Sequence, residues 1–305
     1  MTATATTAGA QARRRRGRRP AAGEAHRLLP APLLVIVTVA LCLMVLIPTA
    51  YIVLASLNTD IGVAEGEFWP SSFTLDSYSK IWTTADLGNG LVNSLIVCSF
   101  TAVASALLGT ITAYVLVRYT FTGRLTILRG LVGLQSIPGT LMLLPVFVLF
   151  SSAGNYLGVT MVGTRWGLFL AYLTFALPFS TWVMVTYLRG LPRELEEAGR
   201  VDGASTLRIL FRIIMPLSLP AIVVSAIFAF LLGWNDVLFA NVLTRPETHT
   251  AAVALSIFGV TQEGGALPVY SQVMAAALVT AAPVVILYLV FQRYLVGGLT
   301  AGGVK

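Results

Sequence analysis

The side chains that most often do chemistry are few in this sequence of 305 residues. Its two cysteines fall within apolar stretches and its two histidines lie outside them, so we expect neither a disulfide nor a metal site. These residues are Cys42, Cys98, His26 and His249. A phosphate-binding loop requires a lysine directly after a glycine, whereas Lys80 follows serine and Lys305 follows valine. We therefore predict no catalytic residue, no metal and no cofactor in this chain.

Any function must be carried by apolar helices, because 56% of the residues are hydrophobic and only 11% are charged. A charge at the centre of a bilayer costs at least ~2.5 kcal/mol, and a helix needs ~20 residues to cross. The charge-free stretches therefore predict an all-α polytopic protein of the cell membrane with six transmembrane helices. We place these helices at about 31–57, 91–117, 130–151, 166–188, from Pro216 to Trp234, and at 270–292.

The six predicted spans contain no Asp, Glu, Arg or His near the middle of the membrane, and Asp236 lies at the outer end of the fifth. Ion-driven transporters and intramembrane enzymes use such residues, so both classes are disfavoured. Pro138, Gly139 and Pro145 are expected to break the third span. A broken helix either lines a cavity or packs as a kinked helix, and the sequence leaves both alternatives open.

The distribution of basic residues predicts the orientation of the chain. Most of the 20 Lys and Arg residues fall before the first span, in the second and fourth connections, or at the C-terminus. Positive loops are retained in the cytoplasm, so both termini are predicted to be cytoplasmic. Residues 1–30 are expected to form a disordered basic tail that contacts anionic lipid rather than nucleic acid. Residues 31–305 form the predicted transmembrane domain, which includes a cytoplasmic loop at 189–216.

This cytoplasmic loop contains a predicted short helix that begins near Pro192 and stops at Gly203. Negative charges in its first turn favour the N-terminal end of the helix dipole. The acidic residues are Glu194, Glu196 and Glu197. Glu196 and Arg200 have the spacing of an i,i+4 ion pair. Ala198 and Gly199 are small enough for the backbone of a partner to approach closely.

A second short helix is predicted at 205–214, lying along the membrane face. Its apolar stripe is expected to contain Leu207, Leu210, Phe211 and Ile214. By pattern alone, the loop could also be a plain surface loop whose arginines set the topology.

The sequence of this loop resembles the signature of ABC importer permeases, which reads EAA, then Gly, then I-x-L-P. The matching residues are 197–199 (EAG), Gly203 and 213–216 (IIMP), at the same spacing. Gly199 stands where alanine is usual, and Met215 where leucine is usual. Further stretches are similar to the maltose-type, carbohydrate-uptake branch. They are 73–78 (FTLDSY), 93–94 (NS), 234–236 (WND) and 291–305 (FQRYLVGGLTAGGVK).

The resemblance implies a type I ABC importer transmembrane domain that serves as the permease subunit of a binding-protein-dependent system. Such a subunit pairs with a homologous membrane subunit, binds two ATPase subunits that hold ATP and Mg, and receives sugar from an extracytoplasmic binding protein. The helix at 194–203 would then be the coupling helix. The residues implied in coupling are Glu194, Glu197, Ala198, Gly199, Asp202, Gly203, Ala204 and Pro216. The outer loop at about 240–271 would approach the binding protein, and 297–305 would reach the ATPases or remain a free terminus.

Polar and aromatic side chains of the third to fifth spans are candidates for sugar contact. These are Gln135, Ser136, Tyr172, Thr174, Trp182 and Asn235. Aromatic residues near span ends can instead be interfacial anchors. Two rival functions remain open on the sequence alone. The same architecture could import another solute, such as glycerol phosphate or an amino acid, or the chain could be an autonomous channel or facilitator.

Overall fold

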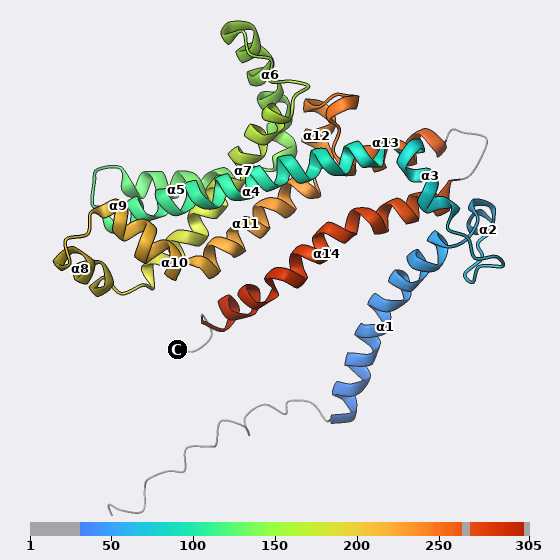
Figure 1. Cartoon of the computed structure of the whole chain (residues 1–305), viewed down its shortest axis with the longest axis horizontal. Helices are drawn as coiled ribbons and strands as arrows, with labels where there is room; N and C mark the ends of the chain where they lie inside the picture. The colour runs from blue at the N-terminus through green and yellow to red at the C-terminus, as the bar shows by residue number, and fades with distance from the viewer. Residues whose placement is uncertain (1–30, 264–268, 302–305) are drawn as a thin grey trace, which may run out of the picture. The chain divides into compact units, whose positions relative to one another are not determined.

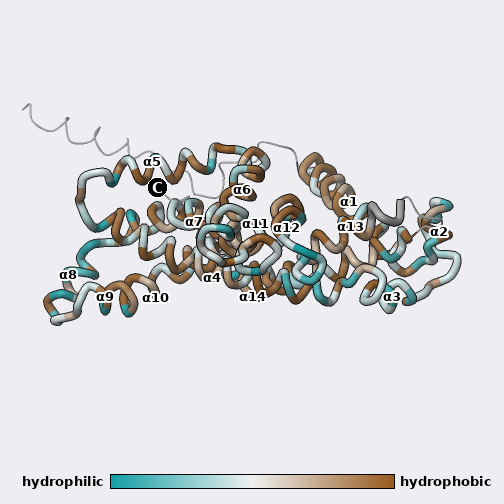
Figure 2. The backbone as a smooth tube through the Cα atoms, turned by 90° about the horizontal axis from the view of Figure 1, so that it is seen from above, coloured by the Kyte–Doolittle hydropathy of each residue, from teal (hydrophilic) through white to brown (hydrophobic). Residues whose placement is uncertain are grey.

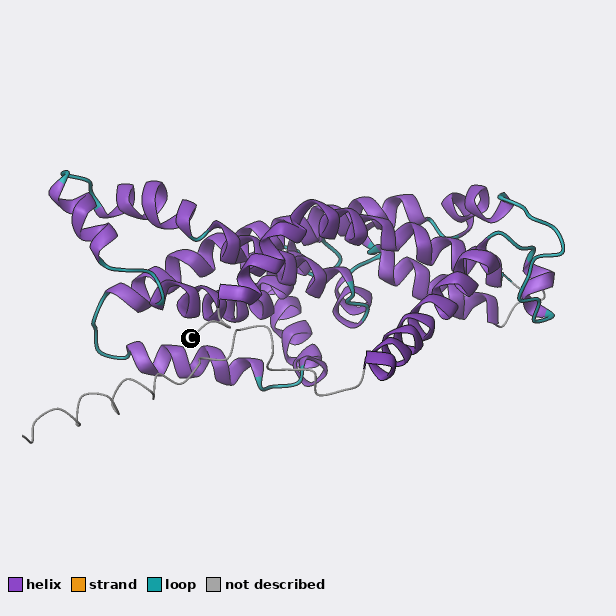
Figure 3. Cartoon of the chain, turned by 90° about the horizontal axis from the view of Figure 1, so that it is seen from below, coloured by secondary structure: helices purple, strands orange, loops and turns teal. Residues whose placement is uncertain are grey.

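The structure is a computed structural model that describes residues 31–263 and 269–301. Within those residues the chain consists of helices and loops (Figure 3). The predicted basic tail at 1–30 lies outside the described residues. The chain divides into two compact units, one up to Tyr51 and the other from Ile52 onward.

Helices of very different lengths follow one another along the chain (Figure 1). They are α1 (Ala31–Ser56), α2 (Asp60–Ala64), α3 (Asp76–Thr84), α4 (Leu87–Arg118), α5 (Arg124–Gln135), α6 (Gly139–Leu157), α7 (Arg165–Arg189), α8 (Glu194–Val201), α9 (Thr206–Ile209), the π-helix η1 (Leu210–Ile214), α10 (Met215–Leu217), α11 (Leu219–Trp234), α12 (Leu238–Leu243), the 3-10 helix η2 (Pro246–Thr248), α13 (Ala251–Glu263) and α14 (Tyr270–Ala301).

Five described helices are long and apolar enough to cross a membrane, and a bent pair can supply a sixth span. The five are Pro32–Ser56, Leu87–Arg118, Gly139–Tyr156, Arg165–Arg189 and Tyr270–Tyr294. The bent pair is Thr206–Leu217 with Leu219–Trp234, whose axes differ by 77°. Figure 2 shows hydrophobic residues along the long helices, whereas α8 carries hydrophilic ones.

The third predicted span is wrong in its limits. The helix stops at Gln135 and resumes at Gly139, so the membrane-length segment is Gly139–Tyr156 rather than 130–151. Pro138 has no N–H to donate, and it disfavours helical backbone at Ile137. Pro145, by contrast, lies inside α6 without ending it. Membrane helices tolerate such prolines where neighbouring groups satisfy the freed carbonyl.

The centre of the second unit is formed by α4, α7 and α11, which pack on one another. Small residues let these helices approach closely. A Cβ built at Gly109 of α4 would lie 2.9 Å from the Cβ of Ser180 in α7. A Cβ at Gly233 of α11 would lie 2.8 Å from the ring of Tyr172. The close packing of these three helices fixes the positions of the loops at their ends.

Candidate coupling and translocation sites

The short cytoplasmic helix predicted between the fourth and fifth spans is present as α8. It begins at Glu194 with Arg193 as its N-cap, so Pro192 precedes the helix instead of occupying its first position. Gly203 ends it in the left-handed region, at a φ of +76°. The N–H of Ala204 donates to the carbonyl of Gly199 at 2.9 Å, which is the closing hydrogen bond of a glycine-terminated helix.

Most of the predicted coupling residues are exposed. Gly199 is the buried member of the set, and the neighbouring Glu196 of α8 is buried as well. Six of the eight are exposed, namely Glu194, Glu197, Ala198, Asp202, Gly203 and Pro216, and Ala204 is half-buried. Glu197 and Ala198 are therefore available to a partner on the free face of the helix.

Gly199 is expected to admit the backbone of a partner, but it packs against side chains of its own chain. A Cβ at this position would lie 3.0 Å from Cδ1 of Ile213 and 3.3 Å from Cγ1 of Ile209. The close approach at Gly199 is thus made by the chain's own following segment rather than by the backbone of a partner. An alanine here would require these isoleucines to shift by a few tenths of an ångström.

Glu196 pairs with a residue that its helix does not contain. Instead of the expected Arg200, its Oε1 lies 2.5 Å from Nε of Arg118, the last residue of α4. The hydroxyl of Tyr114 donates to Oε2 of Glu196 at 3.1 Å. Helical spacing could not indicate this pair, because its members are separated by three other helices. The only sequence signal is the basic residue that ends the second span.

The second short helix predicted at 205–214 is present as α9, which continues into the π-helix Leu210–Ile214. Of the four residues expected on its apolar stripe, Leu210 and Ile214 are buried, whereas Leu207 and Phe211 are exposed. Ile209 is also buried. A π-helical turn contains more residues than an α-helical turn, so the residues after Ile209 do not keep the spacing of an α-helix.

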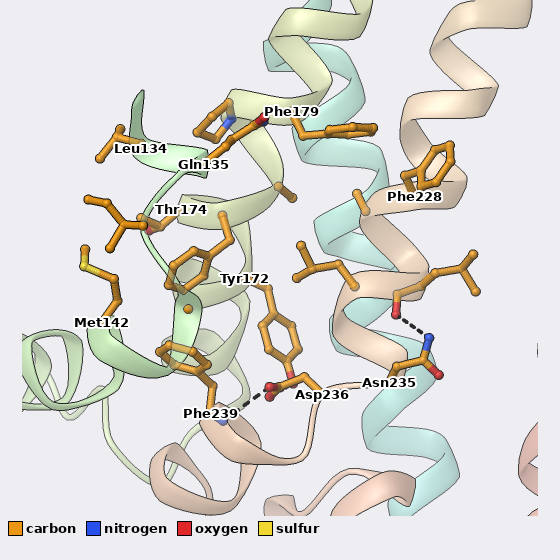
Figure 4. Close-up of a pocket in the computed structure, with 18 residues that line it drawn as sticks. Leu134, Gln135, Met142, Tyr172, Thr174, Phe179, Phe228, Asn235, Asp236 and Phe239 are labelled. Atoms are coloured by element: carbon orange, nitrogen blue, oxygen red, sulfur yellow. Dashed lines mark hydrogen bonds between the residues drawn. The ribbon is translucent and has the colours of Figure 1, made fainter. Parts of the chain in front are cut away.

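Four of the six predicted sugar-contact residues line one cavity of about 750 Å³. They are Gln135, Tyr172, Thr174 and Asn235. Figure 4 shows Gln135 and Phe179 at one end of this cavity and Asp236 at the other. Ser136 and Trp182 do not line the cavity, and the indole of Trp182 is instead half exposed beside the ring of Phe179.

The polar end of the cavity is built by Tyr172 and Asp236. The Tyr172 hydroxyl donates to Oδ2 of Asp236 at 2.9 Å, and Figure 4 shows the two side chains meeting. The same oxygen accepts the N–H of Ala240 at 2.9 Å. The side-chain amide of Asn235 donates back to the carbonyl of Leu231 at 3.0 Å. Asp236 therefore holds the start of α12 against α7. The sequence places Asp236 at the end of a span but does not assign it to a cavity.

Most of the remaining wall is aromatic or aliphatic. The aromatic members besides Tyr172 are Phe175, Phe179, Phe228 and Phe239. The rings of Phe175 and Phe239 lie 4.9 Å apart, and those of Phe179 and Phe228 lie 5.2 Å apart. Asp236 is the charged residue among those that line the cavity. The arrangement offers flat apolar faces together with a few hydrogen-bonding groups.

The outer segment predicted as a loop at 240–271 contains helices over its described residues. These are the end of α12, η2 and the whole of α13, together with the first two residues of α14. Asn93 of α4 donates from Nδ2 to the carbonyls of Glu247 and His249, at 3.1 and 2.9 Å. Its Oδ1 accepts from Nε of Arg165 at 2.7 Å. The N-terminal part of α4 therefore holds this segment in place. Burial lowers the pKa of His249 below its usual value, so the ring stays neutral near pH 7.

The family described as the binding-protein-dependent transport system inner membrane component matches residues 105–300. A trehalose transport system permease protein of Mycobacterium tuberculosis is 32% identical over 85% of this chain and 92% of its own length. A trehalose/maltose transport system permease protein of Thermococcus litoralis is 31% identical over 92% of this chain and 99% of its own. An alpha-glucoside transport system permease protein of Rhizobium meliloti is 37% identical over 77% of this chain, but the match spans 61% of that relative.

Solved structures show the same fold. A chain of a bacterial ABC transporter involved in the import of the acidic polysaccharide alginate superposes with a TM-score of 0.73 at 21% identity. The superposition covers 86% of this chain and 95% of that one. The chain therefore belongs to the family of binding-protein-dependent transport system inner membrane components. It is a multi-pass membrane protein with the fold of an ABC importer transmembrane domain.

Proposed function

We propose that this chain is the permease subunit of an ABC importer that takes up a neutral sugar or oligosaccharide. The observation that carries the proposal is the match, over most of the chain, to permeases named for trehalose and maltose transport. The subunit would form half of the translocation pathway, together with a homologous membrane subunit. An extracytoplasmic binding protein would deliver the cargo.

The chemistry of the cavity favours a neutral cargo over glycerol phosphate. Aromatic rings can stack on the C–H faces of a sugar ring, and Tyr172, Asn235 and Gln135 offer groups that can bond sugar hydroxyls. A phosphate or carboxylate is usually held by Arg or Lys. No Arg or Lys is among the lining residues, and the carboxylate of Asp236 would repel an anion. An amino acid would likewise find no basic group for its carboxylate on this side of the pathway.

The energy for uptake would come from two separate ATPase subunits, which bind ATP and Mg. This division of labour agrees with the absence of a lysine directly after glycine anywhere in the sequence. The exposed face of α8, with Glu197 and Ala198, would seat in the ATPase and act as the coupling helix. Coupling requires that α8 bind the two ATPase states with different affinities. With α8 at the cytoplasmic side, both termini would also be cytoplasmic.

Reconstitution tests the proposal against its rivals. We expect affinity-purified chain to bring down a second permease and an ATPase from membranes. Proteoliposomes that contain this complex should take up radiolabelled trehalose or maltose only with ATP inside and the binding protein outside. Solute flux through the chain alone, without ATP, would favour a channel. Binding of glycerol phosphate or an amino acid, rather than a sugar, by the co-purified binding protein would refute the cargo assignment.

An aromatic pair in α7 tests the cavity. Phe179 lines it, whereas Trp182, three residues later, does not. Phe179→Leu should raise the KM of uptake by about two- to twelvefold, because one stacked ring contributes about 0.5–1.5 kcal/mol. Trp182→Leu is the matched control and should leave KM unchanged. Uptake measured at several sugar concentrations separates the two variants, and equal KM values for both would remove Phe179 from the pathway.

A further inference from the structure

The buried residues of α8 show how the helix is attached to the rest of the chain. Gly199 packs on Ile209 and Ile213, which belong to the segment that follows α8 directly. Glu196 instead contacts α4, a membrane-spanning helix that is distant in sequence. The face that carries Glu197 is exposed. Glu196 is therefore the side chain of α8 that bonds directly to a transmembrane helix.

This attachment is a buried network rather than a surface contact. The side chains of Arg118 and Glu196 are 6% and 4% exposed. Arg118 also donates from an Nη to the carbonyl of Leu191, in the turn before α8, at 3.2 Å. Tyr114 supplies a further hydrogen bond to Glu196 from one turn earlier in α4. The network thus holds both the helix and the turn that leads into it.

The contact between α8 and α4 is an ion pair, and this indicates that it fixes the geometry of α8 more than it stabilises the fold. An apolar pair of similar size would usually stabilise a fold as well as a buried ion pair does, because burying two charges costs solvation. Apolar side chains can slide past one another, whereas an ion pair with two further hydrogen bonds has defined directions. The network therefore resists displacement of α8 relative to the end of α4.

The other end of α4 is attached just as specifically. Asn93 and Ser94 bind the outer segment, with Ser94 Oγ accepting the N–H of Ala251 at 2.9 Å. From Asn93 to Arg118 the helix is continuous and spans about 38 Å at 1.5 Å per residue. A single helix thus joins the cytoplasmic network to the outer segment.

We propose that Arg118, Tyr114 and Glu196 are positioning residues that lock α8 to α4, so that α4 carries movement of α8 to the outer segment at 247–251. The proposal rests on the proposed function, because it takes α8 as the helix that the ATPases move. It adds a direct route to the outer surface that does not pass through the bend between α10 and α11.

The test uses the complete transporter with its ATPase subunits in proteoliposomes. A reporter cysteine is introduced as Glu247→Cys, at an exposed position, after Cys42→Ser and Cys98→Ala. Labelling by a membrane-impermeant maleimide is timed without nucleotide and with ATP, Mg and vanadate. Vanadate traps the ATPases in one nucleotide-bound state. In the chain with no further substitution, we expect the labelling rate in this trapped state to differ by about fivefold or more from the rate without nucleotide.

The double variant Arg118→Met/Glu196→Met separates transmission from folding, because it leaves no unpaired charge. It should reach normal membrane abundance and retain its ATPases, yet its labelling rate should change less than about twofold on trapping. Arg118→Met alone should lose the response as well. Arg129→Met removes an exposed cation of α5 and should respond like the parent.

Three results would overturn the proposal. The first is a normal response in the double variant, and the second is no response in the parent although it hydrolyses ATP. The third is a double variant that does not accumulate in the membrane, which would assign the pair to folding. Failure of the proposed function itself is recognised separately, because then no ATPase would co-purify with the parent chain.

Discussion

Glu197→Lys should abolish ATP-driven uptake while leaving the protein in the membrane. Glu197 is exposed on α8, and its carboxylate forms no hydrogen bond or ion pair with another described residue. Folding should therefore tolerate the change. We expect uptake to fall by about tenfold or more, because the charge would be reversed on the face of α8 that is proposed to seat in the ATPase. Initial uptake rates, normalised to the amount of permease in the membrane, measure the effect.

The matched control is Glu65→Lys. Glu65 is also exposed, but it caps α2, far along the chain from α8. This variant should transport normally. Co-purification of the ATPase with each variant shows whether Glu197 acts in binding or in coupling. Normal uptake by Glu197→Lys at normal abundance would refute the assignment of α8 as the coupling helix.

Gly109→Leu should prevent stable folding of the transmembrane unit. A Cβ at Gly109 would lie 2.9 Å from the Cβ of Ser180 and 3.0 Å from its carbonyl carbon, so α4 and α7 would have to separate. Overpacking of this kind costs about 1–3 kcal/mol or more, which exceeds the gain of at most about 1 kcal/mol from replacing glycine in a helix. We expect low membrane abundance and a lower temperature of aggregation in detergent.

Gly133→Leu provides the matched control. Gly133 is also helical, in α5, and no atom lies within 4 Å of a Cβ built there. This variant should be at least as stable as the parent. Size-exclusion profiles after heating in detergent compare the two proteins. If both variants aggregate at the same temperature, the α4–α7 contact is not as tight as the structure indicates.

Much of the fold could be predicted because the controlling interactions are local. The long apolar helices follow from solvation of each segment by lipid, which depends on that segment's own side chains. The short helix α8 follows from its acidic first turn and from Gly203, whose φ of +76° suits glycine. The break before Gly139 follows from Pro138, although the same reasoning wrongly predicts a break at Pro145.

The errors arise where a contact with another segment decides the local structure. The helix expected at 205–214 contains a π-helix that interrupts the α-helical period, and residue spacing does not reveal that change. Residue type favours Trp182 as a sugar contact, but this side chain is not among the residues that line the cavity. Gly199 is expected to face a partner, but it faces Ile213 of its own chain.

The sequence by itself determined that this is a helical membrane protein with a short acidic helix between two spans, and its signature residues indicated the permease family. Those properties depend on hydropathy, charge and turn chemistry within single segments. Only the tertiary structure decided that Glu196 pairs with Arg118, that Tyr172 meets Asp236, and which residues enclose the cavity. These contacts join residues that are distant along the chain, and the packing of α4, α7 and α11 brings them together.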